Sequence, residues 1–466
     1  MTAAQFIFQI DNLLYTWCMI YLLVGAGLYF TIRTGFVQIR LLGASFRCMM
    51  EKKRSEKGVS SFQALMIATA SRVGTGNMAG VATAIVIGGP GSAFWMWAIA
   101  VIGAASAFVE STLAQIYKRR DGDVFKGGPA YYIERALNAR WLGVSFAVSL
   151  IVTFAVGFNG LQSFNIVSAF QYYVPSLEQS GLPVFIGLFL SVVSLFLFFG
   201  GTEKIGMVSA VLVPFMAIVY ILMGVIIVIL NVSEIPAVFS AIFRSAFDFK
   251  AIFGGFSGSC LVYGIKRGLF SNEAGMGSAP NASASADVSH PAKQGLAQTV
   301  SVYIDTLLIC STTVFILLLT GVYKTDPSLT GIPLLQQSMK TQFGAFSAHL
   351  ITVSICLFAF TSIIGNYYYA ESNILFISKN PRVMKIFRIL SAVVVFFGAQ
   401  NNINLAWHLS DLMMGIQAVV NIVAITLLSG IAFRALKDYE RQQKEGKDPV
   451  FYERNIGLTN TDVWKA

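Results

Sequence analysis

Apolar stretches long enough to cross a lipid bilayer recur along the whole chain, and they limit the possible folds more than any other feature. The stretches lie at 13–32, 60–88, 92–117, 142–173, 182–200, 206–231, 251–273, 296–322, 347–377, 384–401 and 406–433. A helix of roughly 20 residues spans a hydrocarbon core of roughly 30 Å, and the alternating pattern of an outer-membrane barrel is absent. Only 12% of the residues are charged, against about 25% in soluble domains. The sequence therefore predicts an all-α integral membrane protein with about 11 transmembrane helices.

The basic residues are distributed unequally between the two sides of these expected helices. Of 33 Lys and Arg residues, 28 lie in alternate connections and in the segment after residue 433. The other side has only Arg244, Lys250, Lys324 and Lys340, and the remaining basic residue lies within a span. Because Lys and Arg are enriched in cytoplasmic loops, we expect the N-terminus outside and the C-terminus in the cytoplasm. The net charge of +10 is then explained by basic residues in the cytoplasmic loops. Nucleic acid is therefore not an expected partner.

The residue types that carry catalysis or metal binding do not cluster in the sequence. The five cysteines lack metal-ligand spacing, and the three histidines are scattered. No paired acids and no Ser/His set occur at membrane depth, which argues against a membrane-embedded enzyme. No repeated filter loop is visible, which argues against an ion channel.

The second apolar stretch is interrupted by "SRVGTGNMAG", residues 71–80. Each glycine inside a helix costs roughly 1 kcal/mol, and an arginine at bilayer depth costs several more. A helix broken there would present the Thr75 and Gly76 amides to a carboxylate and free nearby carbonyls for a cation. The alternative is tight helix packing, because Gly76 and Gly80 form a GxxxG face.

A second glycine-interrupted stretch, "AIFGGFSGSCLVYGIKRGLF" at 251–270, lies in the corresponding position of the second half. Two such helices indicate an inverted-repeat transporter with a binding site at the membrane midplane. The expected organisation is an extra N-terminal helix in 1–33 and a ten-helix core in 34–433. The repeats lie at about 60–231 and 251–433. A charged cytoplasmic tail, 434–466, is expected to be only partly ordered.

Several longer strings are similar to a known family. "GTGNMAGVATAIVIGGPGSAFWMW" and "GLFSNEAGMGSAPNASA" resemble the sodium:alanine/glycine symporters, also called the amino-acid carrier protein family. "FKGGPAYYIERAL" and "FAFTSIIGNYYYAE" resemble it as well, and the similarity extends from about residue 12 to 450. The family belongs to the amino-acid/polyamine/organocation superfamily. The resemblance implies a LeuT-type fold with a five-plus-five inverted repeat and one added N-terminal helix.

The resemblance also implies a function. It predicts a multi-pass protein of the bacterial inner membrane that imports a small neutral amino acid, alanine or glycine, by alternating access. Sodium is the expected coupling ion, with no other cofactor, and the protein is not an enzyme. Import of serine or glutamine, or coupling to protons, remains an alternative, and the sequence does not indicate the oligomeric state.

Site residues follow from the resemblance at the first break and in the helix around 347–377. Thr75 and Gly76 would hold the substrate carboxylate, with Asn77 beside them. Sodium would be bound by the carbonyls of Ala70 and Val73 and by the hydroxyls of Thr361 and Ser362. The alternative for these two hydroxyls is hydrogen bonding to the preceding helical turn.

Further residues are expected around the substrate. Gly255, Ser257 and Gly258 would line the opposite wall. Gln162 is the preferred side-chain contact, with an interhelical hydrogen bond as the alternative. Asn366 stands where several alanine carriers have tryptophan, which would enlarge or polarise the pocket.

Arg72 requires a buried partner. Counted from residue 60 at 1.5 Å per residue, it lies about 18 Å deep. Asp305 and Glu110 lie at comparable depth on other helices, and buried arginines in membranes are usually paired. We therefore expect Arg72 to pair with Asp305 or Glu110, as an inner gate or a structural clamp.

Overall fold

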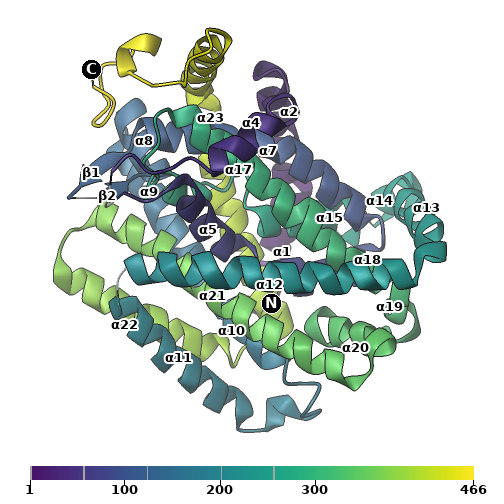
Figure 1. The fold of residues 1–466 in the computed structure, drawn as a ribbon. Coiled ribbons are helices and arrows are strands. Elements are labelled where there is room, and N and C mark those ends of the chain that lie inside the picture. Colours follow the sequence, from purple (N-terminus) through teal and green to yellow (C-terminus); the bar gives the residue numbers. More distant parts are fainter. Residues whose placement is uncertain (1–2, 56–57, 123, 201, 256–257, 466) are drawn as a thin grey trace.

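The computed structural model describes residues 3–55, 58–122, 124–200, 202–255 and 258–465, and almost all of them fold into packed helices (Figure 1). Eight helical segments in the described chain are long and apolar enough to cross a bilayer. They are Phe6–Arg33, Ser92–Ile116, Arg140–Ser168, Leu182–Gly200, Val211–Leu230, Pro291–Thr320, Ala345–Ile377 and Ile403–Lys444. Multiple membrane spans are therefore confirmed, whereas the number eleven and the orientation of the termini stay predictions.

These segments consist of the following elements. They are α1 (Ala3–Leu14), η1 (Tyr15–Met19), α2 (Ile20–Arg33), α7 (Ser92–Ile116), α9 (Arg140–Ile151), η3 (Val152–Phe158), α10 (Asn159–Ser168), α11 (Leu182–Gly200), α12 (Thr202–Leu230), α17 (Pro291–Tyr303), η7 (Ile304–Cys310), α18 (Ser311–Thr320), α21 (Ala345–Ile377) and α23 (Ile403–Lys444). The elements η1, η3 and η7 are π-helical turns within otherwise continuous helices.

Shorter elements connect or interrupt the long helices. They are α3 (Val37–Arg40), α4 (Leu42–Met49), α5 (Ser61–Arg72), η2 (Gly76–Gly80), α6 (Val81–Gly88), β1 (Arg119–Asp121), β2 (Val124–Lys126), α8 (Pro129–Ala136), η4 (Leu177–Gln179), η5 (Val232–Glu234), α13 (Ile235–Ala246), α14 (Phe249–Gly254), α15 (Cys260–Asn272), α16 (Ala279–Ser283), α19 (Val322–Thr325), α20 (Gly331–Phe343), α22 (Pro381–Gly398) and η8 (Glu453–Ile456). Strands β1 and β2 form an antiparallel hairpin with Arg119 opposite Lys126.

Glycines allow the helices that frame the centre to approach one another closely. A Cβ at Gly365 of α21 would lie 2.7 Å from the Ser71 backbone nitrogen of α5. A Cβ at Gly398 of α22 would lie 2.5 Å from the Gly160 Cα of α10. Small residues at helix crossings are typical of membrane bundles, where packing rather than hydrophobic burial drives association. These contacts fix α5 and α10 against the second half of the chain.

The bundle has two distinct ends. Its basic end, which we define as residues 50–60, 117–128 and 284–290, lies beside α8 and the C-terminal segment (Figure 1). Residues 59 and 286 pair there as an isolated parallel bridge. Lys266 and Arg267, which the sequence suggested for a loop on this side, are instead buried within α15. The basic side keeps its large excess of Lys and Arg without them.

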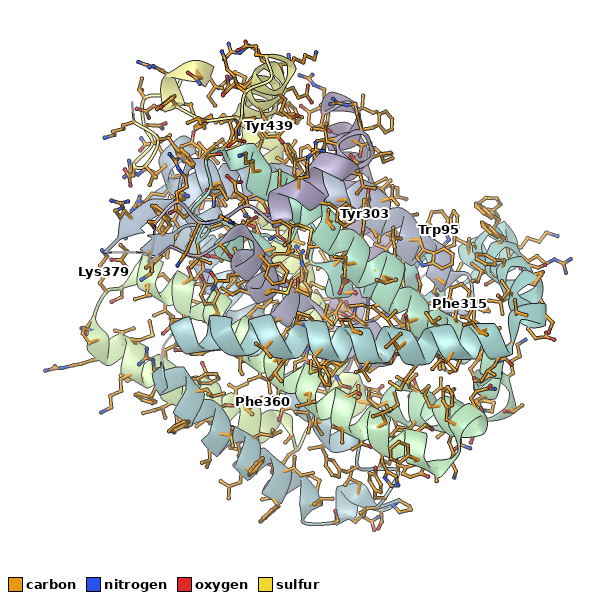
Figure 2. The ribbon with its side chains drawn as sticks, in the orientation of Figure 1. Trp95, Tyr303, Phe315, Phe360, Lys379 and Tyr439 are labelled. Atoms are coloured by element: carbon orange, nitrogen blue, oxygen red, sulfur yellow. The ribbon has the colours of Figure 1, made fainter. Side chains whose placement is uncertain are left out.

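A polar contact joins helix α13 to the bundle, and its donor, Trp95, is labelled in Figure 2. Trp95 of α7 donates its indole N–H to the Ala246 carbonyl at the end of α13, at 3.2 Å. Lys379, in the connection between α21 and α22, is exposed and labelled in Figure 2. Tyr439 is buried near the end of α23, within the segment expected to be poorly ordered. The tail is thus a continuation of the fold.

Candidate substrate and ion site

The first break lies in the predicted place, between α5 and η2. The last regular bond of α5 runs from the Val73 N–H to the Thr69 carbonyl. The Gly74 N–H then donates to the Asn77 side-chain oxygen at 2.9 Å, and not to the Ala70 carbonyl four residues back. The Ala70 carbonyl consequently lacks its usual helical donor. The break therefore leaves a backbone acceptor inside the bundle.

Thr75, at the start of the resumed helix, binds two amide side chains of α10. Its hydroxyl donates to the Gln162 oxygen at 2.8 Å and accepts from the Asn165 nitrogen at 2.9 Å. All three residues are buried. The structure thus brings Gln162 to the break, as expected, through an interhelical hydrogen bond.

A second interruption lies inside the bundle, beyond the predicted one. Helix α14 ends at Gly254 and α15 begins at Cys260, with Ser259 as its N-cap, whose side chain accepts from the Val262 N–H. Helix α15 continues to Asn272, and the chain then turns through Glu273, Gly275 and Gly277, all with positive φ, before α16 begins. These residues are buried. A buried interruption therefore lies at 273–278, and the substrate contacts expected of Gly255, Ser257 and Gly258 stay predictions.

Gly255 and Gly258 are exposed and lie before the N-terminus of α15, while Ser257 is outside the described residues. Cys260, which opens α15, packs against Gly88 at the far end of α6. Gly76 lies twelve residues away from that end, about 18 Å along a helix. The opposite wall of the site is formed by residues nearer the other end of α15.

The break between α5 and η2 and the buried interruption at 273–278 face one another across the centre of the bundle. The Ser71 hydroxyl donates to Glu273 at 2.9 Å, and the Asn77 amide donates to the Ser271 hydroxyl at 2.9 Å. A Cβ at Gly76 would lie 2.6 Å from the Phe270 ring. The ring of Phe270 thus covers the amides at the start of η2.

Asp305 of η7 lies between the breaks and is held by neutral donors. The Asn77 amide donates to one carboxylate oxygen at 2.7 Å, while the Ser271 hydroxyl and the Thr306 hydroxyl donate to the other. Cys310, one helical turn further on, lies 3.3 Å from the Asn77 nitrogen. A buried carboxylate with neutral partners is able to bind a cation or a proton.

Glu110 of α7 stabilises the second break. Its carboxylate accepts the backbone N–H groups of Gly275 and Gly277, at 3.3 and 3.1 Å, and the Asn421 amide at 2.9 Å. These N–H groups have no helical acceptor because the chain turns away from α15. Glu110 therefore satisfies the interrupted backbone.

The expected ion pair of Arg72 is not formed. Arg72 is 2% exposed and donates to Gln298 at 3.1 Å and to the Ser301 hydroxyl at 2.7 Å, both on α17. Within the described chain neither Glu110 nor Asp305 reaches ion-pair distance of Arg72, because their oxygens are bound by the groups above. The positive charge nevertheless acts on Glu110, Asp305 and Glu273. Arg72 balances a group of buried carboxylates without contacting one.

The predicted hydroxyl pair on α21 divides into two different environments. The Thr361 hydroxyl donates to the Phe358 carbonyl one turn earlier, at 2.9 Å. The Ser362 hydroxyl is buried without a hydrogen-bond partner and lies against Gly74, in the first break. Both hydroxyl oxygens therefore keep lone pairs for an ion, and Ser362 is the one without a hydrogen-bond partner.

Asn366, one turn further along α21, also reaches the centre. Its oxygen accepts from Ser71 at 2.7 Å, and its nitrogen donates to Asn159 at 3.1 Å. An amide at this position therefore joins α21 to both α5 and α10.

The sequence analysis missed several residues that line the centre: Phe270, Ser271, Glu273 and Asn421. The stretch "SNEAGMGS", with an acid followed by two glycines, contained the signal for the second break. Its charge and glycine content are equally typical of a surface connection. The burial of these residues in the structure distinguishes the two possibilities.

A cavity of about 710 Å³ lies away from the breaks, at the end opposite the basic end. It is lined by the outer part of α10 and by residues from the segments 175–184, 328–333 and 399–403, and the described residues that line it are uncharged. Ser168 and Gln171 belong to this lining and continue the helix that carries Gln162. The cavity is therefore lined in part by α10, the helix whose Gln162 lies at the first break.

Comparison with known proteins identifies relatives along nearly the whole chain. The model of the "Sodium:alanine symporter family" matches residues 1–453. Amino-acid carrier protein AlsT of Bacillus subtilis is 47% identical over 450 residues, covering 96% of this chain and 95% of that protein. Sodium/alanine symporter AgcS of Methanococcus maripaludis is 36% identical over 439 residues, covering 91% and 95%.

Among solved structures, MhsT in complex with L-phenylalanine superposes with a TM-score of 0.56 at 12% identity, covering 83% of this chain and 98% of that one. This similarity supports a LeuT-type transporter fold. Together with the facing helix breaks, these matches show that the chain belongs to the sodium:alanine symporter family and is a multi-pass secondary transporter, not an enzyme.

Proposed function

We propose that the chain imports a small neutral amino acid across the bacterial inner membrane, driven by the sodium gradient, with its site between the two buried breaks. The observation that carries this proposal is the direct contact of the breaks through the Ser71–Glu273 and Asn77–Ser271 hydrogen bonds. Interrupted helices at membrane depth provide backbone groups for ligands while the bundle shields them from lipid. Alternating access would follow from movement of one half of the chain against the other.

The substrate carboxylate fits the start of η2. The Thr75 and Gly76 amides stand at the N-terminus of a helix that continues to Gly88, where the helix dipole favours negative charge. Phe270 packs between Phe158 and Trp407, with ring centroids 4.6 and 5.3 Å away. This aromatic cover leaves room for a short side chain, which favours alanine or glycine. Serine and glutamine remain candidates because Asn366 adds polarity to the same region.

The sodium ion fits between α5 and α21. The Ala70 carbonyl lacks its helical donor, and the Ser362 hydroxyl lacks any partner. Neutral oxygen ligands of this kind suit a weakly held, exchanging alkali ion. Val73 and Thr361 would complete the ligand set, because the Thr361 oxygen keeps its lone pairs while its hydrogen is donated to the Phe358 carbonyl.

Removing either hydroxyl should impair sodium activation. In Ser362→Ala we expect the sodium concentration for half-maximal uptake to rise by about tenfold, the effect of losing about 1.4 kcal/mol of ligand interaction. Thr361→Ala should raise it as well, since a hydroxyl that donates to the Phe358 carbonyl keeps its oxygen lone pairs for the ion. Uptake at graded sodium concentrations measures both, and unchanged sodium activation in both variants would contradict the assignment.

Coupling to protons is the alternative, and Asp305 is the group that would carry the proton. Flux of labelled alanine into proteoliposomes, with a sodium gradient or a pH gradient alone, separates the two ions. The proposed function predicts accumulation with the sodium gradient and competition by glycine, serine or glutamine according to preference. Flux that is the same with and without either gradient would reject coupled transport.

A further inference from the structure

The C-terminal segment after α23 folds back over the basic end of the bundle (Figure 1). Two aromatic side chains of this segment are buried, Phe451 at 2% and Trp464 at 4% exposed. Tyr452, next to Phe451, is 39% exposed. The segment therefore has a definite inward face.

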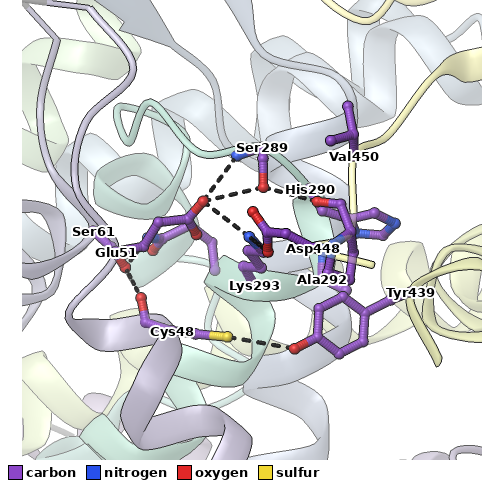
Figure 3. A network of polar contacts seen from close by, with 12 residues as sticks. Cys48, Glu51, Ser61, Ser289, His290, Ala292, Lys293, Tyr439, Asp448 and Val450 are labelled. Carbon is purple, nitrogen blue, oxygen red and sulfur yellow. Dashed lines mark hydrogen bonds and ion pairs between the residues drawn. The ribbon is translucent and has the colours of Figure 1, made fainter. Parts of the chain in front are cut away.

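The first attachment is the polar network of Figure 3, which joins the segment to the start of α17. The Phe451 N–H donates to the Ser289 carbonyl at 3.0 Å, and the Ser289 hydroxyl donates to the Pro449 carbonyl at 2.8 Å. Lys293 forms ion pairs with Asp448 at 2.7 Å and with Glu51 at 3.1 Å. One lysine thus links the segment to both α17 and the chain after α4.

His290 lies at the centre of this attachment. Its ring contacts Tyr439 and Phe451 edge-on, and its Nε2 lies 3.4 Å from Asp438. Burial lowers the pKa of His290, although Asp438 opposes the shift. His290 is fully buried, so this attachment is a packed contact.

The second attachment is made by Trp464 at the end of α7. The indole N–H donates to the Gln115 carbonyl at 2.8 Å, and the ring lies 4.9 Å from the Lys118 nitrogen. Lys118 in turn donates to the Ala286 carbonyl at 2.8 Å. Burial lowers the pKa of Lys118 to about 7. Asp462 adds an ion pair with Arg135 of α8 at 2.7 Å.

Both attachments hold residues 284–290, which directly follow the second break and α16. This stretch is also joined to the beginning of α5, which leads to the first break. The Asp287 N–H donates to the Val59 carbonyl at 2.9 Å, and Gln294 donates to the Ser61 hydroxyl at 2.6 Å. Ala64 of α5 packs against Ala286 in a small apolar cluster. A path from the site to the basic end requires this junction to part.

We propose that residues 445–465 are a latch that holds the basic end closed and must release before the site opens toward that end. The proposal rests on the proposed alternating access. It agrees with the sizes of the two cavities: about 710 Å³ at the opposite end of the described bundle, against about 100 Å³ at the basic end beside Arg119, Lys126 and Lys379. The latch crosses the junction of the two segments that lead to the two breaks, so its release frees both at once.

A cysteine placed at Ala64 reports on this junction without touching the latch. Ala64 is fully buried and packs against residues 286 and 288. Alkylation of Ala64→Cys by N-ethylmaleimide in proteoliposomes, followed by mass spectrometry, gives the rate at which the junction opens. Lys379→Cys, on the exposed connection, controls for reagent access. Native Cys260, at the far end of α15, detects general unfolding.

In the Phe451→Ala background we expect the cysteine at position 64 to react about tenfold faster, while Cys260 reacts at its former rate. The adjacent, exposed Tyr452→Ala should leave both rates unchanged. Truncation after Lys444 should reproduce the effect of Phe451→Ala. If both latch variants react like the parent, or if Cys260 accelerates equally, the segment only stabilises the fold and the latch is rejected. Labelling does not depend on the substrate, so failure here is distinct from failure of amino-acid uptake.

Discussion

Gly76→Ala is expected to reach the membrane in normal amounts and to lose substrate binding. A Cβ at this position would lie 2.6 Å from the Phe270 ring, which is itself packed between Phe158 and Trp407. The methyl group would displace either the ring or the carboxylate from the Thr75 and Gly76 amides. Because hydrogen bonds to a charged group contribute about 1.5–3 kcal/mol each, losing one or two weakens binding by about 100-fold. Scintillation-proximity binding of labelled alanine to the purified variant measures this loss.

Gly80→Ala is the matched control, one helical turn further on. A Cβ there meets its nearest atoms, of Arg267 and Trp407, at 3.4 Å, an ordinary van der Waals distance. If Gly76 served only helix packing, Gly76→Ala should lose folded protein, and the fraction that folds should bind alanine as Gly80→Ala does. Alanine binding by Gly76→Ala at the parent affinity would place the carboxylate site elsewhere.

Arg72→Met is expected to prevent accumulation of folded protein. The guanidinium is buried, and among the described residues it is the cation whose charge acts on the carboxyl groups of Glu110, Glu273 and Asp305, so methionine removes that charge. Leaving buried charge uncompensated typically costs about 3–5 kcal/mol. The amount of monodisperse protein after solubilisation, and its melting temperature, measure the loss.

A second substitution and a control define the cause. Glu273→Gln in the Arg72→Met background should recover folded protein, since it removes one of the unbalanced charges. Arg40→Met is the control, because Arg40 pairs with Glu440 at 2.6 Å and has a side chain that is 46% exposed. Its loss should cost only about 1 kcal/mol. No recovery from neutralising Glu273, Asp305 or Glu110 in turn would show that Arg72 serves only its hydrogen bonds to α17.

The first break was predictable because its signal is local. A continuous helix would be destabilised by Arg72 and by the glycines at 74 and 76, because each of them is unfavourable inside an apolar helix. The buried interruption at 273–278 was not predicted, because two glycine-rich segments lie in the same region. The glycines at 254–258 precede an N-cap at Ser259, whereas Gly275 and Gly277 lie in a buried turn whose backbone Glu110 satisfies. That partner is distant in sequence, so no local pattern reveals it.

The partners of Arg72 could not be predicted for a similar reason. Counting residues gives the depth of a side chain in the membrane but not the direction in which it points around its helix. Arg72 faces α17, while Glu110 and Asp305 are bound by groups of the breaks.

A small number of buried residues is enough to order the C-terminal segment. Its charged composition is typical of a solvated tail, yet Phe451 and Trp464 bury enough surface to fix it against the bundle. The average composition of the segment is dominated by its charged residues, so it does not reveal the effect of two buried aromatic side chains.

Protection of Cys310 by substrate tests the central claim most directly. Its sulfur lies 3.3 Å from the Asn77 nitrogen and 3.0 Å from the Ser271 hydroxyl, so it reports on the space between the two breaks. The rate of its reaction with methyl methanethiosulfonate can be followed by mass spectrometry with sodium, alanine, both or neither present. We predict that alanine and sodium together slow the reaction of Cys310 more than either alone, and that alaninamide, which lacks the carboxylate, gives no protection. Unchanged reactivity under conditions in which alanine is bound would contradict a site between the breaks.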